Sequence, residues 1–209
     1  MDVPTTLPEK LYLLAYDPER GRHTGTLNLD PALRAAALTE LLHRGLIRDD
    51  GRHPVGVDGA ADGLDPLSAR LLEQIRQGRR RSWKSWIGRQ GFPSHMVRDG
   101  LAAAGRIRVE KRRVLRIFPV ARVTLPEPRV HKALASGITS ALKGPLSRVD
   151  RADAALVALA DGARLGSVLT RRRRREFRAR IDKLAPVTGP IRRALRRAVD
   201  AQNSDGGAG

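Results

Sequence analysis

Six basic side chains lie close together between Arg106 and Arg116, and their chemistry is that of anion binding. Guanidinium and ammonium groups donate charge-assisted hydrogen bonds to phosphate or carboxylate oxygens. The surrounding stretch Leu101–Val120 reads LAAAGRIRVEKRRVLRIFPV, which is typical of a helix end at Gly105, a strand, a charged turn and a second strand. We expect one face of this hairpin to present its cations to an anionic partner: Arg106, Arg108, Lys111, Arg112, Arg113 and Arg116.

Patterns typical of catalysis or metal binding are missing from the sequence. The chain has no Cys, which excludes disulfides, thiolate zinc sites and a cysteine nucleophile. It has no Gly-rich phosphate loop and no GxSxG motif. We interpret His43 as a partly buried or surface residue and not a catalytic base. We predict a binding protein and not an enzyme, with no cofactor and no metal site, because no ligand spacing relates the histidines: His23, His43, His53, His95 and His131.

The net charge of +18 at pH 7 is unevenly distributed along the chain. Residues 1–70 hold 8 Lys and Arg against 11 Asp and Glu, whereas the remainder holds 32 against 11. A surface with such an excess attracts nucleic acid or anionic lipid headgroups. The alternative is a soluble Arg-rich protein from a high-GC genome, in which the charge serves solubility alone.

The elements that must position these cations follow an order that occurs twice: a helix, a glycine, a short strand, a turn and a return strand. The first unit follows a helix that begins at Asp30-Pro31 and ends at Gly45. The second follows the helix Met96–Ala104. We expect Glu110–Arg113 to form the turn of the second unit, and an extended connection to run from Pro119 to Pro128.

Most of the remaining chain carries apolar residues at helical spacing. The segment Arg148–Ala163 is nearly all apolar in its second half and predicts a central buried helix. Trp83 and Trp86, three residues apart, indicate core packing rather than base stacking. We expect a mainly α fold, with helices packed around the central helix and a protruding basic β-hairpin.

The chain is predicted to form one domain followed by a tail. The last periodic helix spans Pro190 to Val199, and the sequence AQNSDGGAG after it predicts disorder. We therefore expect a single domain over residues 1–200 and a disordered tail over 201–209. The first ten residues lack the features of a signal peptide, and no apolar run approaches the ~20 residues of a membrane span. A cytoplasmic protein with peripheral membrane contact is the expectation.

Two kinds of anionic partner fit the hairpin. In the first, the second unit is a winged-helix module, with Met96–Ala104 in the major groove of DNA and Lys111–Arg113 as the wing. That helix offers only Arg98 to base edges, which makes nucleic acid the weaker interpretation. In the second, the basic face lies on an anionic membrane, where each Lys or Arg contributes about 1 kcal/mol. An oligomeric scaffold with charge kept for solubility is a third alternative.

Five segments occur in an order and spacing that carry a family resemblance. They are Leu7–Leu14 (LPEKLYLL), Leu33-Arg34 with Glu40–Ile47 (ELLHRGLI), Trp86-Ile87, Gly105–Lys111 (GRIRVEK) with Val114-Leu115, and the helix Arg148–Ala160. Together they resemble the Golgi phosphoprotein 3 family, whose members are peripheral proteins that bind phosphatidylinositol 4-phosphate. The Arg- and Ala-rich composition indicates an actinobacterial member.

The resemblance implies a headgroup pocket made by a Trp and three Arg on a flat basic face. Arg34 matches one of these arginines, and Arg89 and Arg98 are the nearest candidates for the others. The Trp position falls near Gly25, so the aromatic is missing. The resemblance also implies an adaptor at the inner face of the membrane, which holds membrane enzymes through their cytoplasmic tails. It further implies membrane contact or homo-oligomer formation through the hairpin, at Arg108, Lys111, Arg112 and Arg113.

Overall fold

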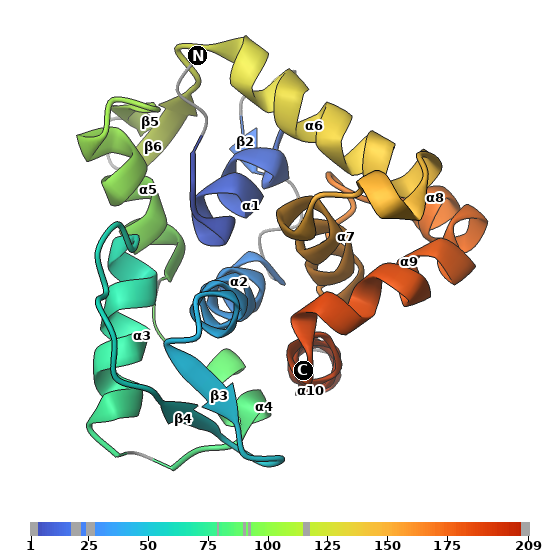
Figure 1. Cartoon of the computed structure of the whole chain (residues 1–209). Helices are drawn as coiled ribbons and strands as arrows, with labels where there is room; N and C mark the ends of the chain where they lie inside the picture. The colour runs from blue at the N-terminus through green and yellow to red at the C-terminus, as the bar shows by residue number, and fades with distance from the viewer. Residues whose placement is uncertain are drawn as a thin grey trace.

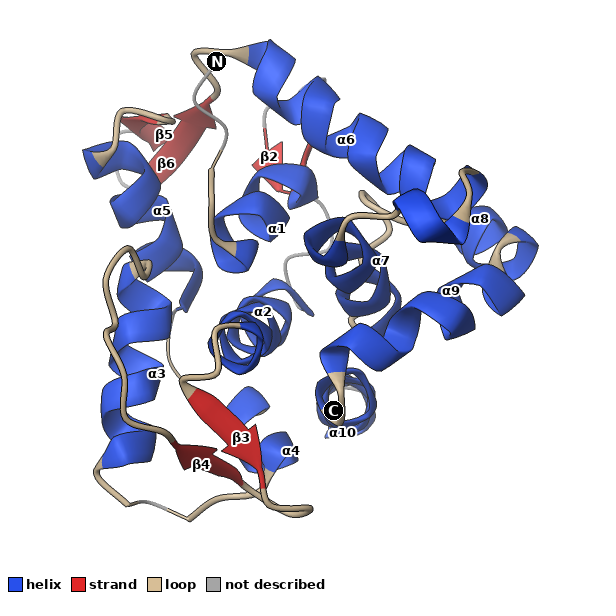
Figure 2. Ribbon diagram, viewed as in Figure 1, coloured by secondary structure: helices blue, strands red, loops and turns tan. Residues whose placement is uncertain are grey.

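Helices make up most of the chain in the computed structural model, which confirms the mainly α prediction (Figures 1 and 2). The structure describes residues 4–17, 22–23, 28–78, 80–89, 91, 93–114 and 118–205. The α-helices are α1 (Leu7–Ala15), α2 (Leu29–His43), α3 (Pro66–Arg76), α4 (Trp83–Ile87), α5 (Pro93–Ala103), α6 (Pro128–Lys143), α7 (Arg151–Gly162), α8 (Arg171–Glu176), α9 (Arg178–Leu184) and α10 (Ile191–Asp205). Two 3-10 turns are η2 (Leu146–Arg148) and η3 (Ala185–Thr188).

The strands of the described ranges pair as small antiparallel sheets of two strands each. Each sheet joins neighbours in sequence, so the described residues form no sheet layer, and helices enclose most of the core (Figure 2). The strands contribute a few buried residues to that core, among them Ile47 and Val123. The pairs are β1 (Tyr16–Asp17) with β2 (Arg22–His23), β3 (Ile47–Asp49) with β4 (Pro54–Gly56), and β5 (Arg108–Val114) with β6 (Phe118–Thr124).

Short polar residues begin several of the helices. The carboxylate of Asp65, directly before α3, accepts hydrogen bonds from the backbone N–H groups of Leu67 (3.1 Å) and Ser68 (3.0 Å). Asp150 caps α7 in the same way, and Thr170 caps α8. Each cap satisfies N–H groups that the first helical turn leaves without an intrahelical acceptor. Because these contacts are local, the start of α3 can be predicted from sequence.

Two helices, not one, form the buried centre of the fold. α7 is buried continuously from Ala154 to Gly162, which confirms the predicted central helix. α2 is buried from Pro31 to Leu41, and it packs against α1, α3, α4, α5, α7 and α10 (Figure 1). Its polar residues Arg34 and Glu40, only 7% and 8% exposed, conceal this burial in the sequence pattern. A buried guanidinium needs polar surroundings, so Arg34 marks a place where the core opens.

Both helix–glycine–hairpin units form as the sequence predicts. Gly45 follows α2 at φ 70° and Gly105 follows α5 at φ 68°, conformations that favour glycine. After each glycine, the next backbone N–H donates to the carbonyl five residues before it, at 3.0 Å and 2.9 Å respectively. This is Schellman closure of a helix end. The hairpins β3–β4 and β5–β6 therefore leave the helical core through the same local geometry.

The second hairpin is longer than the sequence pattern predicts. Glu110–Arg113, predicted as the turn, lie within β5, where Arg112 pairs with Val120. The predicted extended connection that begins at Pro119 is strand β6 as far as Thr124. The charged residues do not end the ladder, because backbone pairing continues wherever the partner strand supplies residues that favour β structure. The connection at positions 115–117, Arg116 included, lies outside the described residues.

α10 extends to Asp205, so the predicted disordered tail is wrong over residues 201–205. Ala201 and Gln202 are good helix formers, and no Gly or Pro interrupts the segment before Gly206. Positions 206–209 lie outside the described residues. Within the described ranges, none of the helices combines the length and apolar character needed to span a bilayer.

Candidate functional site

An arginine-lined hollow of about 380 Å³ opens between α2, α3 and the segment that joins α4 to α5. It brings together Arg34 and Arg89, two of the three arginines to which the family resemblance points, and adds Arg70 and His95. Its volume lies within the range of small-ligand sites. We call it the Arg34 hollow, and its apolar lining comprises Leu67, Leu71, Pro93 and Met96.

α3 supplies one wall of the Arg34 hollow. Leu67, Arg70, Leu71 and Gln74 all line it, and their spacing of three and four residues places them on one helix face. Leu67 and Leu71 are buried, whereas Arg70 is exposed. Arg70 and Gln74 were not among the site residues predicted from the sequence. A usable signal existed, since a polar residue on the face of buried leucines must lie at the rim of the core.

Arg34 reaches the hollow from the buried side of α2. Burial lowers the pKa of its guanidinium, Asp30 acts to raise that pKa, and Arg89 acts to lower it further. An arginine keeps its proton through shifts of this kind, so Arg34 remains a cation. The carboxylate of Asp30 also accepts a hydrogen bond from the Ser94 backbone N–H at 3.0 Å, which ties the start of α5 to α2. The cation is therefore fixed in position by the packing of two helices.

Arg89 lies over an aromatic platform at the end of α4. Its guanidinium carbon is 5.5 Å from the centre of the Trp86 ring, within cation–π range. Trp83 and Trp86 are 5% and 0% exposed, which confirms their predicted core role. The indole N–H of Trp83 donates to a carboxylate oxygen of Asp49 at 2.9 Å and joins α4 to β3. The tryptophans therefore serve the site indirectly, as a rigid support for Arg89.

Gly91 forms part of the wall of the hollow beside Arg34. Its φ of 128° lies in the region that side chains rarely adopt. A Cβ at this position would lie 3.2 Å from Nη2 of Arg34. Only glycine therefore leaves the backbone this close to the guanidinium without pushing it aside.

Arg98 does not reach the Arg34 hollow. It lines a neighbouring hollow of about 300 Å³ with Tyr12, His23 and Asp30. Its Nη2 lies 2.8 Å from a carboxylate oxygen of Asp99, and the pair is exposed on the aspartate side. Of the two candidates that the resemblance gave beside Arg34, Arg89 therefore lines the same hollow as Arg34, and Arg98 lines a different one.

The hairpin positions are only partly described. Arg108 is exposed at the start of β5, while the side chains of Lys111, Arg112 and Arg113 lie outside the described residues, as does Gly25. Arg106 was expected on the presented basic face, but this prediction is wrong. Its Nη1 donates to Glu9 at 3.0 Å, and its side chain is 18% exposed. It thus joins the hairpin to α1.

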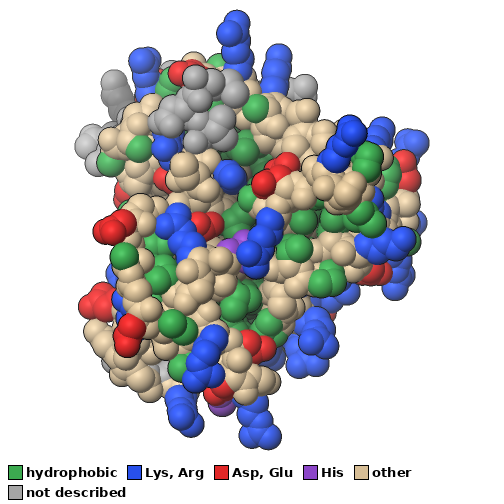
Figure 3. Space-filling view, in the orientation of Figure 1, with side chains coloured by type: hydrophobic (Ala, Val, Ile, Leu, Met, Phe, Trp, Pro, Cys, Tyr) green, Lys and Arg blue, Asp and Glu red, His purple; other side chains and the backbone are tan. Residues whose placement is uncertain are grey.

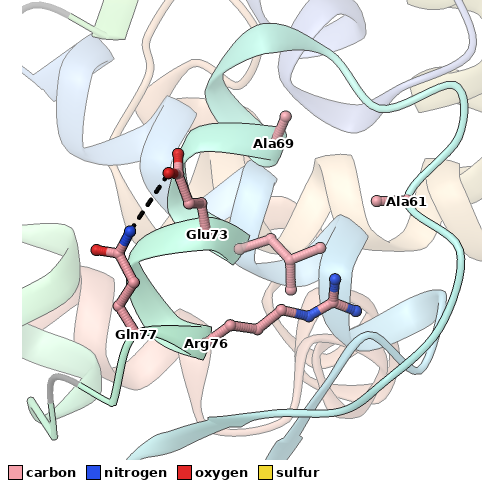
Figure 4. A pocket seen from close by; sticks show the side chains of 6 residues that line it. Ala61, Ala69, Glu73, Arg76 and Gln77 are labelled. Atoms are coloured by element: carbon pink, nitrogen blue, oxygen red, sulfur yellow. Dashed lines mark hydrogen bonds between the residues drawn. The ribbon is translucent and has the colours of Figure 1, made fainter.

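Another hollow, of about 410 Å³, lies along the opposite face of α3 (Figure 4). Its polar side chains are already bonded within the protein, in contrast to a binding site. Arg76 lines it, but its Nη2 donates to the backbone carbonyls of Val57 (2.7 Å) and Gly59 (3.0 Å). Gln77 donates to the Glu73 carboxylate at 3.3 Å. Arg76 thus holds the loop before α3, and it is the only cation in the described lining of this hollow, where no arginines converge as they do in the Arg34 hollow.

The surface charge does not by itself mark a site. On the face shown in Figure 3, Lys and Arg side chains stand at many separate points with Asp and Glu between them. Over the described ranges, no three His, Cys, Asp or Glu residues come together as a metal site would require. His43 is partly buried, as predicted, with Nε2 2.8 Å from the Val187 carbonyl. A binding site for an anion is therefore better indicated by a place where several arginines converge.

Comparison with known proteins gives one assignment. A family model described as Golgi phosphoprotein 3 (GPP34) matches residues 7–202, nearly the whole chain. Among curated proteins, no match was found. The matched range includes α1 to α9, most of α10 and every residue of the Arg34 hollow.

Proposed function

The chain belongs to the Golgi phosphoprotein 3 family, and on that premise we propose that it binds the phosphate of an anionic phospholipid headgroup in the Arg34 hollow. The headgroup is of the phosphoinositide class, with phosphatidylinositol 4-phosphate as the ligand implied by the family. The protein then attaches peripherally to the inner face of a membrane. This is a binding function, in which the protein performs no chemical step.

The observation that carries the proposal is the convergence of Arg34, Arg70 and Arg89 from three separate segments of the chain. The described lining of this hollow contains no Asp or Glu. Guanidinium groups bind phosphate oxygens through two parallel hydrogen bonds, and a fixed guanidinium loses less freedom on binding than a mobile one. Arg34 is fixed by burial in α2, and Arg89 by Trp86.

The hairpin supplies a second, weaker contribution in this proposal. Arg108 is exposed, and Lys111, Arg112 and Arg113 follow it in β5. Cations near an anionic leaflet attract it by about 1 kcal/mol each, and salt screens this attraction. We extend the proposal to self-association through this hairpin, and to an adaptor role toward the cytoplasmic tails of membrane proteins.

Vesicle co-sedimentation tests the lipid proposal. Phosphatidylcholine vesicles carrying phosphatidylinositol 4-phosphate should bind the protein, while neutral vesicles should not. Arg34→Ala should weaken binding by roughly tenfold or more, because a charge-assisted phosphate contact is lost. Arg48→Gln is the matched control, since Arg48 is exposed on β3 and lies outside the hollow lining.

Two outcomes would contradict the lipid proposal. One is equal binding to neutral and anionic vesicles. The other is equal loss of binding in Arg34→Ala and Arg48→Gln, which would mean that net charge alone acts. A parallel gel shift with duplex DNA tests the winged-helix alternative, for which tight and strongly salt-dependent binding is expected in the absence of vesicle binding.

A further inference from the structure

Seven arginines surround a second hollow, of about 490 Å³, formed by the end of α7 with α8, α9 and α10. In Figure 1 these helices lie on the right, whereas α3 and α5, which flank the Arg34 hollow, lie on the left with α2 between them. We call this second site the arginine cup. Its arginines are Arg164, Arg171, Arg174, Arg175, Arg178, Arg192 and Arg196, and Asp161, Asp182 and Ile181 complete its lining.

The five consecutive arginines at 171–175 form helix α8, and the helix points them in different directions. Positions 171, 174 and 175 follow the spacing of one face of α8, and all three line the cup, together with Arg178 at the start of α9. Arg172 is exposed and does not line it, and Arg173 instead donates to Thr139 on α6 at 3.3 Å. The cup is therefore built from selected members of the run, and it is not a consequence of arginine content alone.

Asp161 fixes two of the arginines in the floor of the cup. It is 8% exposed, and its Oδ2 accepts from Arg192 (2.7 Å from Nη2, 3.2 Å from Nε) and from Arg196 (2.7 Å from Nη2). Asp182 accepts a further bond from Arg192 at 3.1 Å. The two guanidiniums are thus held in a defined position before any ligand arrives, which lowers the entropic cost of binding.

The charges of the cup are not balanced from within. Its lining has seven Arg against two Asp, and Asp161 already accepts hydrogen bonds from Arg192 and Arg196 of α10. Nη1 of Arg174 is buried and has no hydrogen-bond partner among the described residues. Burial lowers the pKa of Arg174, Asp161 acts to raise it, and Arg164, Arg171 and Arg196 act to lower it. An anion in the cup would supply the acceptor that this donor lacks and would offset the like charges around it.

We propose that the arginine cup binds a compact anion that carries two or more phosphate groups. Asp200, next to the lining, pairs with Arg164 at 2.7 Å, so seven Arg face three Asp. Several phosphates match the remaining excess of four positive charges, which a single phosphate would compensate only in part. The volume suits a small ligand or a single headgroup. Asp182, with a side chain 54% exposed at the cup, would repel a long polyanion laid across it, which disfavours a nucleic acid. This site is separate from the Arg34 hollow.

Calorimetric titration of the full chain with inorganic pyrophosphate tests the proposal. Arg174→Gln should weaken binding by roughly tenfold. Arg172→Gln removes the same charge from the same helix, outside the cup, and should stay within about twofold of wild type at equal salt. Arg171→Gln alters an exposed lining residue, so it keeps the test valid if Arg174→Gln does not fold. Arg34→Ala should retain the cup's affinity, which separates this test from that of the proposed function.

Two results would overturn the proposal: absence of pyrophosphate binding, or equal weakening by Arg172→Gln and Arg174→Gln. The source of the phosphates is decided by a second arm, with vesicles of cardiolipin, whose headgroup carries two phosphates, in the Arg34→Ala background. If Arg174→Gln reduces vesicle binding, the cup takes a lipid headgroup. If it reduces pyrophosphate binding only, the cup takes a soluble phosphate compound. Both results support an anion-binding cup.

Discussion

The Arg34 hollow and the arginine cup gather arginines by opposite means. Arg34 comes from a core helix, and its position is set by burial and by the backbone of Gly91. The cup draws its arginines from helices at the periphery of the fold, and a carboxylate, Asp161, sets the position of two of them. Net charge is therefore a poor guide to a binding site in this fold. What matters is how a guanidinium is held.

Asp161→Asn should give the largest effect, because the cup depends on this carboxylate. The substitution removes the negative charge that Arg192 and Arg196 share and should lower the free energy of unfolding by about 3 kcal/mol, as measured by urea denaturation. Asp182→Asn is the matched control, with an expected change below about 0.5 kcal/mol since its side chain is 54% exposed. Equal effects of the two variants would refute the anchoring role of Asp161.

Gly91→Ala should perturb the other site through its backbone. A Cβ at φ 128° is strained and presses on Arg34 from 3.2 Å, so we expect a loss of about 1–2 kcal/mol in unfolding free energy together with weaker vesicle binding. In the control Gly166→Ala, the new Cβ meets no atom within 4 Å and φ is not in the positive region. Unchanged vesicle binding in Gly91→Ala would show that the hollow does not need this glycine.

Acid should lower the free energy of unfolding of the protein, in part through His23. Burial lowers the pKa of His23 below its usual 6.5, and its hydrogen bond to the Tyr12 carbonyl acts in the opposite direction. The folded state resists protonation, so stability is full above about pH 6.5 and falls as the pH drops below that value toward the lowered pKa. Urea unfolding at a series of pH values should show a smaller acid loss in His23→Gln than in wild type. His43 and His131, whose pKa values burial also lowers, add their own losses in both proteins.

Arg98→Gln should have the smallest effect on vesicle binding of these variants. It tests whether Arg98 belongs to the headgroup site. Arg98 pairs with Asp99 near the surface and lines a different hollow from Arg34. Vesicle binding should therefore stay within about twofold of wild type, whereas Arg89→Gln should weaken it by roughly tenfold. A larger loss of vesicle binding in Arg98→Gln than in Arg89→Gln would show that Arg98, and not Arg89, contacts the headgroup.

Local sequence signals predict much of the helical fold and its ends. Gly45 and Gly105 mark two Schellman closures, and Asp65 marks the start of α3, because each acts within a few residues. The length of the second hairpin could not be predicted. The charged segment Glu110–Arg113 imitates a turn, and only pairing with β6 identifies it as a strand.

Tertiary contacts explain what the sequence conceals about the sites. Arg34 was available from the family resemblance, but its union with Arg70 requires the packing of α2 against α3. The run of arginines at 171–175 gave no hint of a cup, because Arg192 and Arg196 join it only through the folded position of α10. Periodic patterns predict helices well, and they do not predict which faces of different helices meet.

A crystal structure with a soluble headgroup, glycerophosphoinositol 4-phosphate, is the most direct test of headgroup binding in the Arg34 hollow. We predict that a phosphate group of this ligand lies within hydrogen-bond distance of the guanidiniums of Arg34 and Arg89, with its inositol ring toward α3. A headgroup bound elsewhere, with the Arg34 hollow empty while the protein still binds vesicles, would contradict it.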